Sequence, residues 1–253
     1  MRFCVAVYCE FANILSTFEE LAQGQFQWMP ACAAASCHAQ SNADGIGNEK
    51  MKVVSGEAKS VEAAIGFRVK SGWATAVLLA GPIESPQVLD RRIVELSDPA
   101  VPESRQPHHA GTGALEADNK KVAERIKNVK HCTDESVSKL LQDYRDMGCN
   151  LRGAGLAVGS LTEPDTITNL HIRAHALEGR LFRTLLEDAV RAHGLPCFVV
   201  VEQRAYAEAA ASLSREETEL KRAVSSLDRP QRGPWRAEEK MAALIAWMAL
   251  AHD

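Results

Sequence analysis

The sequence predicts an α/β domain in which helices flank a mixed five-stranded sheet. Three β-rich runs follow one another early in the chain, and two short apolar runs alternate with amphipathic patterns further on. The composition is 46% hydrophobic and 25% charged over 253 residues, which is ordinary for a globular protein and sufficient for a sizeable core. The expected order of elements is β-β-β-α-β-α-β-α.

The first three strands are predicted to be antiparallel. Residues 64–69 and 73–79 flank a Lys-Ser-Gly turn, which predicts a hairpin, and residues 87–96 follow the breaker "GPIESP". Residues 97–121 are rich in Pro, Gly and polar residues, so we expect a long loop there. Its pair His108 and His109 is a possible ligand pair, but we expect both side chains to face solvent.

The second half alternates helices and buried strands. Residues 135–147 carry an apolar stripe that ends at Gly148, and the longest helix runs over 171–193, with Thr168 or Asn169 as N-cap and Gly194 closing it. The other elements expected here are strands over 153–160 and 197–202 and a final helix over 236–251.

The first fifty residues differ from the rest. Residues 1–50 mix Cys, Gln and Ala without helical or strand period, so we expect either a poorly ordered extension or a segment added by a misassigned start. The domain is expected over 51–253. Two Cys-x4-Cys pairs and a following histidine lie in this segment, but structural zinc sites use shorter spacings. The residues concerned are Cys4, Cys9, Cys32, Cys37 and His38.

Charge and hydropathy limit the classes of partner. The net charge of -4 does not indicate a broad basic surface, so any nucleic-acid binding must rest on a local basic patch. No apolar run approaches the roughly 18 residues of a membrane span, so we expect no membrane partner. Glu10 interrupts the apolar stretch that would resemble a signal peptide, and the scattered cysteines are typical of reduced thiols. We therefore expect a cytoplasmic protein.

The stretch "AIGFRVKSGWATAVLL" and the order of elements over about 64–251 resemble the ribonuclease H-like superfamily, which includes Holliday-junction resolvases. The resemblance implies two divalent metals held by carboxylates from the first strand, the fourth strand and the last helix. Arg68 and Lys70 stand where the first-strand carboxylate is expected. Glu163 and Asp165 lie in a loop, and Glu238 lies in the last helix. The carboxylate set is therefore incomplete.

A second constellation lies on the long helix. His171, His175 and Glu178 share one helix face, and Glu202 ends the fifth strand at the edge where that helix begins. We expect these side chains, with Arg68, to converge on one pocket. Two histidines and a glutamate suit a transition metal or a histidine general base. The alternative is a set of hydrogen-bonded histidines, with Glu178 paired to Arg173 or Arg180.

Two features favour contact with an anionic partner. The segment "DRPQRGPWR" offers Arg232 for phosphate and Trp235 for stacking, although Trp235 can instead cap the core beneath the last helix. Arg68 and Arg173 also suit an anionic small ligand.

Three functions remain from the sequence, the third of which is a small-ligand protein that binds an anionic group through Arg68 and Arg173. The first is a ribonuclease H-like domain without the usual carboxylates, acting as a binding or regulatory module on nucleic acid or on a nucleic-acid-processing protein. The second is a metal-dependent nuclease or hydrolase with a rearranged site, for which a divalent metal is the possible cofactor. That site consists of His171, His175, Glu178, Glu202 and Glu238.

Overall fold

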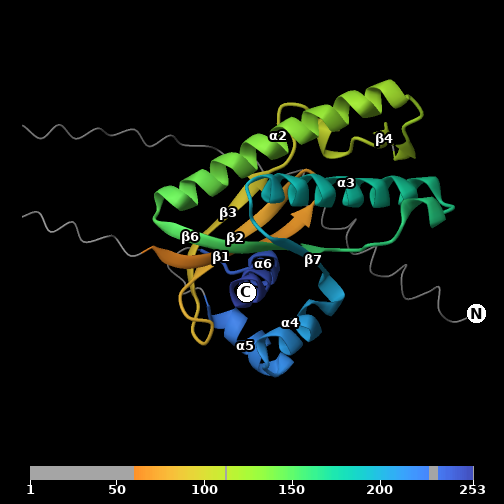
Figure 1. Ribbon diagram of the computed structural model, residues 1–253. Coiled ribbons are helices and arrows are strands. Elements are labelled where there is room, and N and C mark those ends of the chain that lie inside the picture. The colour runs from red at the N-terminus through yellow and green to blue at the C-terminus, as the bar shows by residue number, and fades with distance from the viewer. Residues whose placement is uncertain (1–59, 112, 228–232, 253) are drawn as a thin grey trace, which may run out of the picture. The chain divides into compact units, whose positions relative to one another are not determined.

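The computed structural model describes residues 60–111, 113–227 and 233–252. A five-stranded sheet has the order β3-β2-β1-β6-β7, with β1 antiparallel to β2, β2 antiparallel to β3, and β1, β6 and β7 mutually parallel (Figure 1). The strands are β1 (Val61–Lys70), β2 (Trp73–Ala80), β3 (Gln87–Glu95), β6 (Cys149–Val158) and β7 (Cys197–Val201). This sheet, flanked by helices, confirms the predicted α/β architecture with a mixed five-stranded sheet. The expected N-terminal extension and its cysteines lie outside the described residues.

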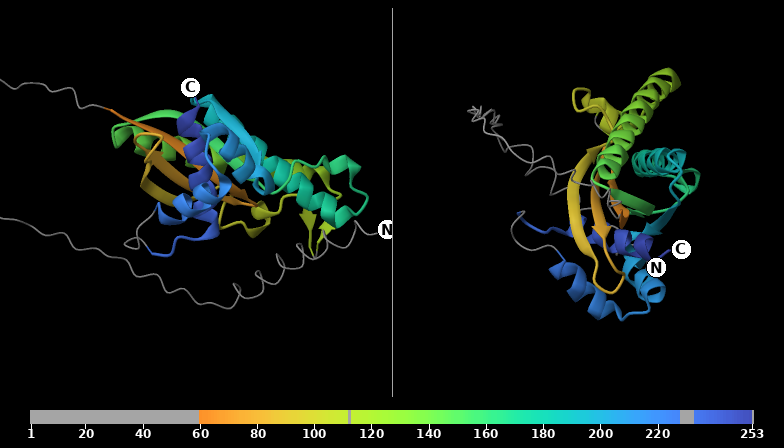
Figure 2. Two further views of the ribbon diagram at one scale, coloured as in Figure 1. Left: turned by 90° about the horizontal axis from the view of Figure 1, so that it is seen from below. Right: turned by 60° about the vertical axis from the view of Figure 1, so that its left-hand side comes forward.

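Helices cover both faces of the sheet. Figures 1 and 2 show α2 (Asn119–Asp146) and α3 (Leu170–Ala192) on one face. On the other face lie α4 (Ala205–Leu213), α5 (Glu217–Ser226) and α6 (Ala237–Ala251). Within the described residues, none of the helices combines the length and the apolar character that a membrane span needs.

Local sequence explains the boundaries of these elements. Gly72 adopts a φ of +86° in the two-residue turn that joins β1 to β2, a conformation that favours glycine. The side chain of Asn169 accepts a hydrogen bond from the Ile172 backbone N–H, so Asn169 is the N-cap of α3. Gly148 and Gly194, at φ +80° and +79°, follow the ends of α2 and α3 as predicted.

The long loop predicted over 97–121 contains more secondary structure than expected. The segment contains the 3-10 turn η1 (Pro102–Arg105) and a small hairpin of β4 (His109–Ala110) and β5 (Ala114–Leu115). Asp118 then caps α2, which begins 16 residues before the predicted helix start at 135. Before Val137 only Val129 and Thr133 of α2 are buried, so the apolar stripe that reveals a helix begins late.

The last helix packs directly on the sheet. Residues 242–250 of α6 are all buried, as expected for a helix that is apolar on every side. Gly66 of β1 permits the contact, because a Cβ there would lie 1.8 Å from the Ala242 carbonyl oxygen. This close approach brings the first turn of α6 beside the end of β1.

Strand alternation divides the side chains of β1 between the two faces. Ile65 and Phe67 belong to the core under α2 and α3, together with Phe182. Gly66 faces α6, so Arg68 and Lys70, two and four residues later, project to that same side. The side chains of Arg68 and Lys70 therefore lie on the face of the sheet that α6 covers.

Candidate functional site

Arg68 lies at the centre of the first candidate site. Its Nη2 donates to Glu202 Oε2 at 2.8 Å, and its Nη1 donates to Glu238 Oε1 at 3.2 Å. Glu202 opens the 3-10 turn η3 (Glu202–Arg204) directly after β7, and Glu238 lies in the first turn of α6. The exposed fractions of the three side chains are 13%, 22% and 35%, so the cluster is partly buried. One guanidinium thus ties three elements together.

Lys70 adds a second cation to this cluster. Burial lowers the pKa of the Lys70 amine, and the charge of Arg68 lowers it further, while Glu202 and Glu238 act in the opposite direction. The cluster holds two cations against two carboxylates, so it has no excess negative charge for divalent ions. Glu163 pairs with Arg180 at 3.2 Å and Asp165 is exposed in the 3-10 turn η2 (Pro164–Thr166), outside this cluster.

The second candidate site is built on α3 and the small hairpin. His109 of β4 is 6% exposed, and its Nδ1 lies 2.6 Å from Oε1 of Glu178, which is fully buried on α3. The carboxylate can only accept, so the His109 ring donates. The Nδ1 of His175 lies 3.7 Å from the other oxygen of Glu178. One buried carboxylate therefore faces two histidines.

His171 completes this group. Its Nδ1 donates to the Gly113 carbonyl at 2.6 Å, and its Nε2 lies 3.3 Å from the Nε2 of His175. The ring centroids of the three histidines are 4.5 to 5.4 Å apart. One nitrogen from each of His109, His171 and His175 lies within 4.8 Å of the others, a spacing that can accommodate a metal ion.

The single pocket expected from the sequence is not formed. Arg68, Glu202 and Glu238 meet at the start of α6, whereas His171, His175 and Glu178 meet His109 on α3. Across the described residues, no hydrogen bond or ion pair joins the two groups. The expectation that His109 faces solvent is also wrong, because the hairpin turns its ring toward Glu178.

Little in the sequence indicates the role of His109. Gly111 and Gly113, at φ +55° and +96°, form the tight turn that follows it, and such glycines are the only local signal. Its partner Glu178 lies 69 residues away. The expected pairing of Glu178 with Arg173 or Arg180 is wrong, since Arg173 donates to the Ile167 carbonyl at 2.7 Å and Arg180 binds Glu163.

The proposed stacking residue Trp235 has a packing role in the structure. Its Nε1 donates to the Val224 carbonyl at 2.7 Å, and its half-buried ring packs on the core around α6. The guanidinium of Arg91 lies 5.5 Å from the ring centroid. These contacts favour the alternative in which Trp235 caps the core. Arg232 lies outside the described residues.

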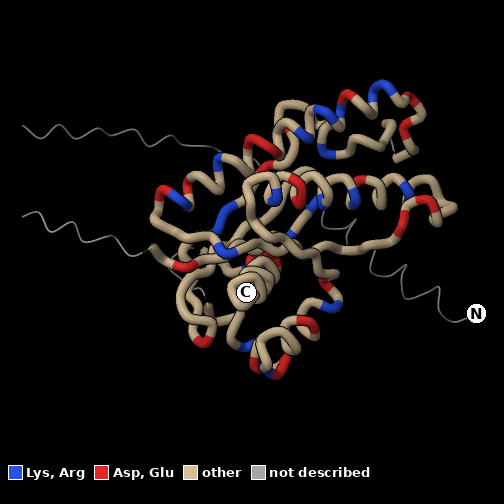
Figure 3. The backbone as a smooth tube through the Cα atoms, in the orientation of Figure 1, with Lys and Arg blue, Asp and Glu red and all other residues tan. Residues whose placement is uncertain are grey.

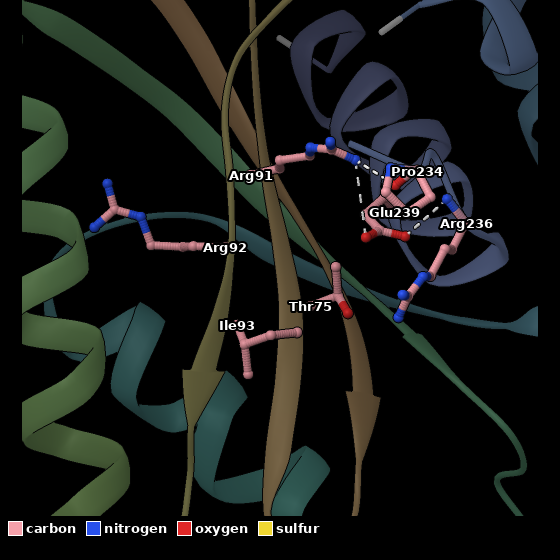
Figure 4. Close-up of a pocket in the computed structure, with 7 residues that line it drawn as sticks. All are labelled: Thr75, Arg91, Arg92, Ile93, Pro234, Arg236 and Glu239. Atoms are coloured by element: carbon pink, nitrogen blue, oxygen red, sulfur yellow. Dashed lines mark hydrogen bonds and ion pairs between the residues drawn. The ribbon is translucent and has the colours of Figure 1, made fainter. Parts of the chain in front are cut away.

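A shallow pocket of about 300 Å³ opens between β3 and the start of α6 (Figure 4). Arg91 lines it but donates to the carbonyls of Pro234 and Gly233 at 2.8 and 3.1 Å, so its guanidinium is already bound to backbone. The other lining residues are Thr75, Arg92, Ile93, Arg236 and Glu239. Arg92 likewise pairs with Asp90 and Asp143.

The comparisons with known proteins yield structural neighbours only. No protein-family model matches the chain, and no curated protein matches it. RuvC of T. thermophilus in complex with Holliday junction substrate is 12% identical, with 74% of this chain and 91% of that chain covered and a TM-score of 0.44.

Two further solved structures are more distant. The yeast mitochondrial Holliday junction resolvase Ydc2 is 10% identical, with 74% of this chain and 78% of that chain covered and a TM-score of 0.38. The Aquifex aeolicus PPX-GPPA enzyme is 18% identical, with 61% and 41% covered and a TM-score of 0.28.

Proposed function

We propose that this protein is a ribonuclease H-like binding module that does not cut nucleic acid by a two-metal mechanism. The observation that carries the proposal is the Arg68 guanidinium, which holds Glu202 and Glu238 where a pair of divalent ions would need free carboxylates. A guanidinium offers only N–H donors and no acceptor atom, so Arg68 cannot replace a carboxylate as a metal ligand.

The charge balance supports the same proposal. A divalent ion in this cluster would have to displace Arg68 from two carboxylates and lie close to the amine of Lys70. Coulomb repulsion between these charges opposes metal binding at this position. The cluster instead ties β1 to the end of β7 and to α6, which is a structural role.

The proposed partner is nucleic acid or a protein that processes it. In Figure 3, Lys and Arg are interspersed with Asp and Glu along the described helices, and several of these charges pair at i,i+4. Such a surface favours a small contact over a long phosphate-tracking groove. The rearranged nuclease that combines Glu202 and Glu238 with the histidines is not supported, because these residues form two separate groups.

The test measures cleavage and binding with the full chain. Branched and linear DNA are incubated with the protein in Mg²⁺ and in Mn²⁺, and binding is followed by fluorescence anisotropy over a salt series. We expect no metal-dependent cleavage, and an affinity for DNA that falls as salt increases. Cleavage that requires Mg²⁺ and disappears in Glu202→Gln, but survives in Glu208→Gln, would overturn the proposal. Glu208 is a suitable control because it pairs only with Arg204, at 3.4 Å among the described contacts.

A further inference from the structure

We propose that His109, His171 and His175 form a mononuclear site for a transition metal of the Zn²⁺ class. Glu178 and the Gly113 carbonyl orient the rings, and a fourth coordination position faces solvent. The inference rests on the hairpin and α3 alone, so it stands independently of the function proposed for the Arg68 cluster.

The hydrogen bonds determine which ring nitrogen of His109 and of His171 is available. In His109 and His171 the Nδ1 donates to an oxygen, of Glu178 in one case and of Gly113 in the other, so Nε2 carries the lone pair. In His175 the Nδ1 lies toward Glu178 and the Nε2 toward His171. Metal-binding histidines commonly donate their second N–H to a carboxylate or a backbone carbonyl in this way.

The spacing of the nitrogens suits tetrahedral coordination. With metal–nitrogen bonds of about 2.0–2.1 Å, two nitrogens of a tetrahedral site lie about 3.3 Å apart. The Nε2 atoms of His171 and His175 lie 3.3 Å apart. Since the ligand atoms of all three residues lie within 4.8 Å of one another, a small ring movement by His109 brings the third nitrogen into place.

Burial supplies a second, independent observation. The Nε2 of His109 is buried and has no hydrogen-bond partner among the described residues, and the same is true of Oε2 of Glu178. An unpaired buried polar atom is destabilising, and a fully buried carboxylate needs positive charge nearby. A bound divalent ion satisfies both requirements, because it accepts the lone pair of His109 and adds positive charge near Glu178.

The site is closed on one side and open on the other. His109 and Glu178 lie in the interior, whereas His171 is exposed and the side chain of His175 is 35% exposed. Three imidazoles with one open position form the ligand set of catalytic zinc sites, in which water or a small anion takes the fourth place. Imidazole nitrogens favour Zn²⁺, Cu²⁺, Ni²⁺ or Co²⁺ over Mg²⁺ and Ca²⁺.

The hairpin is shaped around the histidines. Gly113 adopts φ +96°, and a Cβ there would lie 3.0 Å from the Nδ1 of His171. The turn therefore lets its carbonyl reach the ring at 2.6 Å without a side chain in the way. This backbone contact orients His171 although its side chain lies at the surface.

The test is a Co²⁺ titration of the full chain after treatment with EDTA, followed by visible absorption and by competition with Zn²⁺. The N-terminal cysteines can also bind these ions, so the variants decide the assignment. His171→Ala and His175→Ala remove ligands at exposed or half-exposed positions and leave the buried pair of His109 and Glu178 intact. His131→Ala is the matched control, because His131 is 69% exposed on α2 and pairs only with Glu135 among the described contacts.

We expect wild type and His131→Ala to bind one Co²⁺ with the ligand-field bands of a nitrogen site and no thiolate charge-transfer band. Both ligand variants should lose that ion, and Glu178→Gln should weaken it by about 10–100-fold. Added azide should shift the visible bands if the fourth position is open. The proposal is overturned if His171→Ala and His175→Ala bind the same ion as His131→Ala, or if the only bound ion is held by thiolates.

Discussion

Replacing Arg68 by methionine tests whether the guanidinium is a structural tie. The change keeps an apolar stem but leaves Glu202 and Glu238 without their shared cation. Exposed ion pairs contribute up to about 1 kcal/mol to the free energy of unfolding, whereas removing one partner of a buried pair costs about 3–5 kcal/mol. With exposed fractions of 13%, 22% and 35%, this cluster lies between those limits.

We therefore expect Arg68→Met to lower the free energy of unfolding by about 2–3 kcal/mol. For a domain of this size, the loss corresponds to a fall in Tm of about 4 to 12 °C. Urea unfolding followed by circular dichroism, together with thermal melts, measures both quantities. Adding Glu202→Gln to Arg68→Met should recover part of the loss, because it removes one of the two unpaired carboxylates.

The matched control is Arg204→Met. Its pair with Glu208 has side-chain exposed fractions of 65% and 38%, so the expected loss is below about 1 kcal/mol. Equal destabilisation by Arg68→Met and Arg204→Met would show that Arg68 does not hold β1, η3 and α6 together. An Arg68 that is dispensable for stability but required for DNA binding would instead be a ligand contact.

Three further predictions concern packing and ionisation. Gly66→Ala should lower the free energy of unfolding, measured in urea, by at least about 3 kcal/mol, because the new Cβ would collide with the backbone of α6. Gly159→Ala is the control and should be nearly neutral, because a Cβ there meets nothing within 4 Å. Burial raises the pKa of the Cys197 thiol to about 12, so peptide mapping after alkylation at about pH 8 should find Cys197 unlabelled until urea is added. Lys70→Met should raise the free energy of unfolding at about pH 7, and this increase should shrink toward about pH 10. An increase that stays constant with pH would contradict the prediction. Because the pKa of Lys70 is lower in the folded protein, the unfolded chain binds more protons as the pH approaches the pKa of the unfolded lysine. The free energy of unfolding of the wild type therefore rises with pH in this range, and the advantage of Lys70→Met falls.

The sequence predicted the sheet better than it predicted the sites. Strand runs and turn glycines such as Gly72 and Gly194 act through local backbone physics, which a single sequence carries. The first half of α2 was missed because its side chains are mostly exposed and leave no apolar stripe. Arg68 was recognised by its place on the first strand, but its pairing with Glu202 spans 134 residues and depends on the packing of α6.

The histidine group shows why the fold does not determine the chemistry here. Glu178 lies on α3, which packs beside the sheet, yet its partner His109 comes from the small hairpin between β3 and α2. His109 lies 2.6 Å from one oxygen of the buried Glu178 carboxylate, and His175 lies 3.7 Å from the other. His171 and His175 share a face of α3, and the hairpin between β3 and α2 brings the third imidazole, His109, to that face. Any activity of the histidine group has to be established from this site, because the same sheet supports unrelated functions.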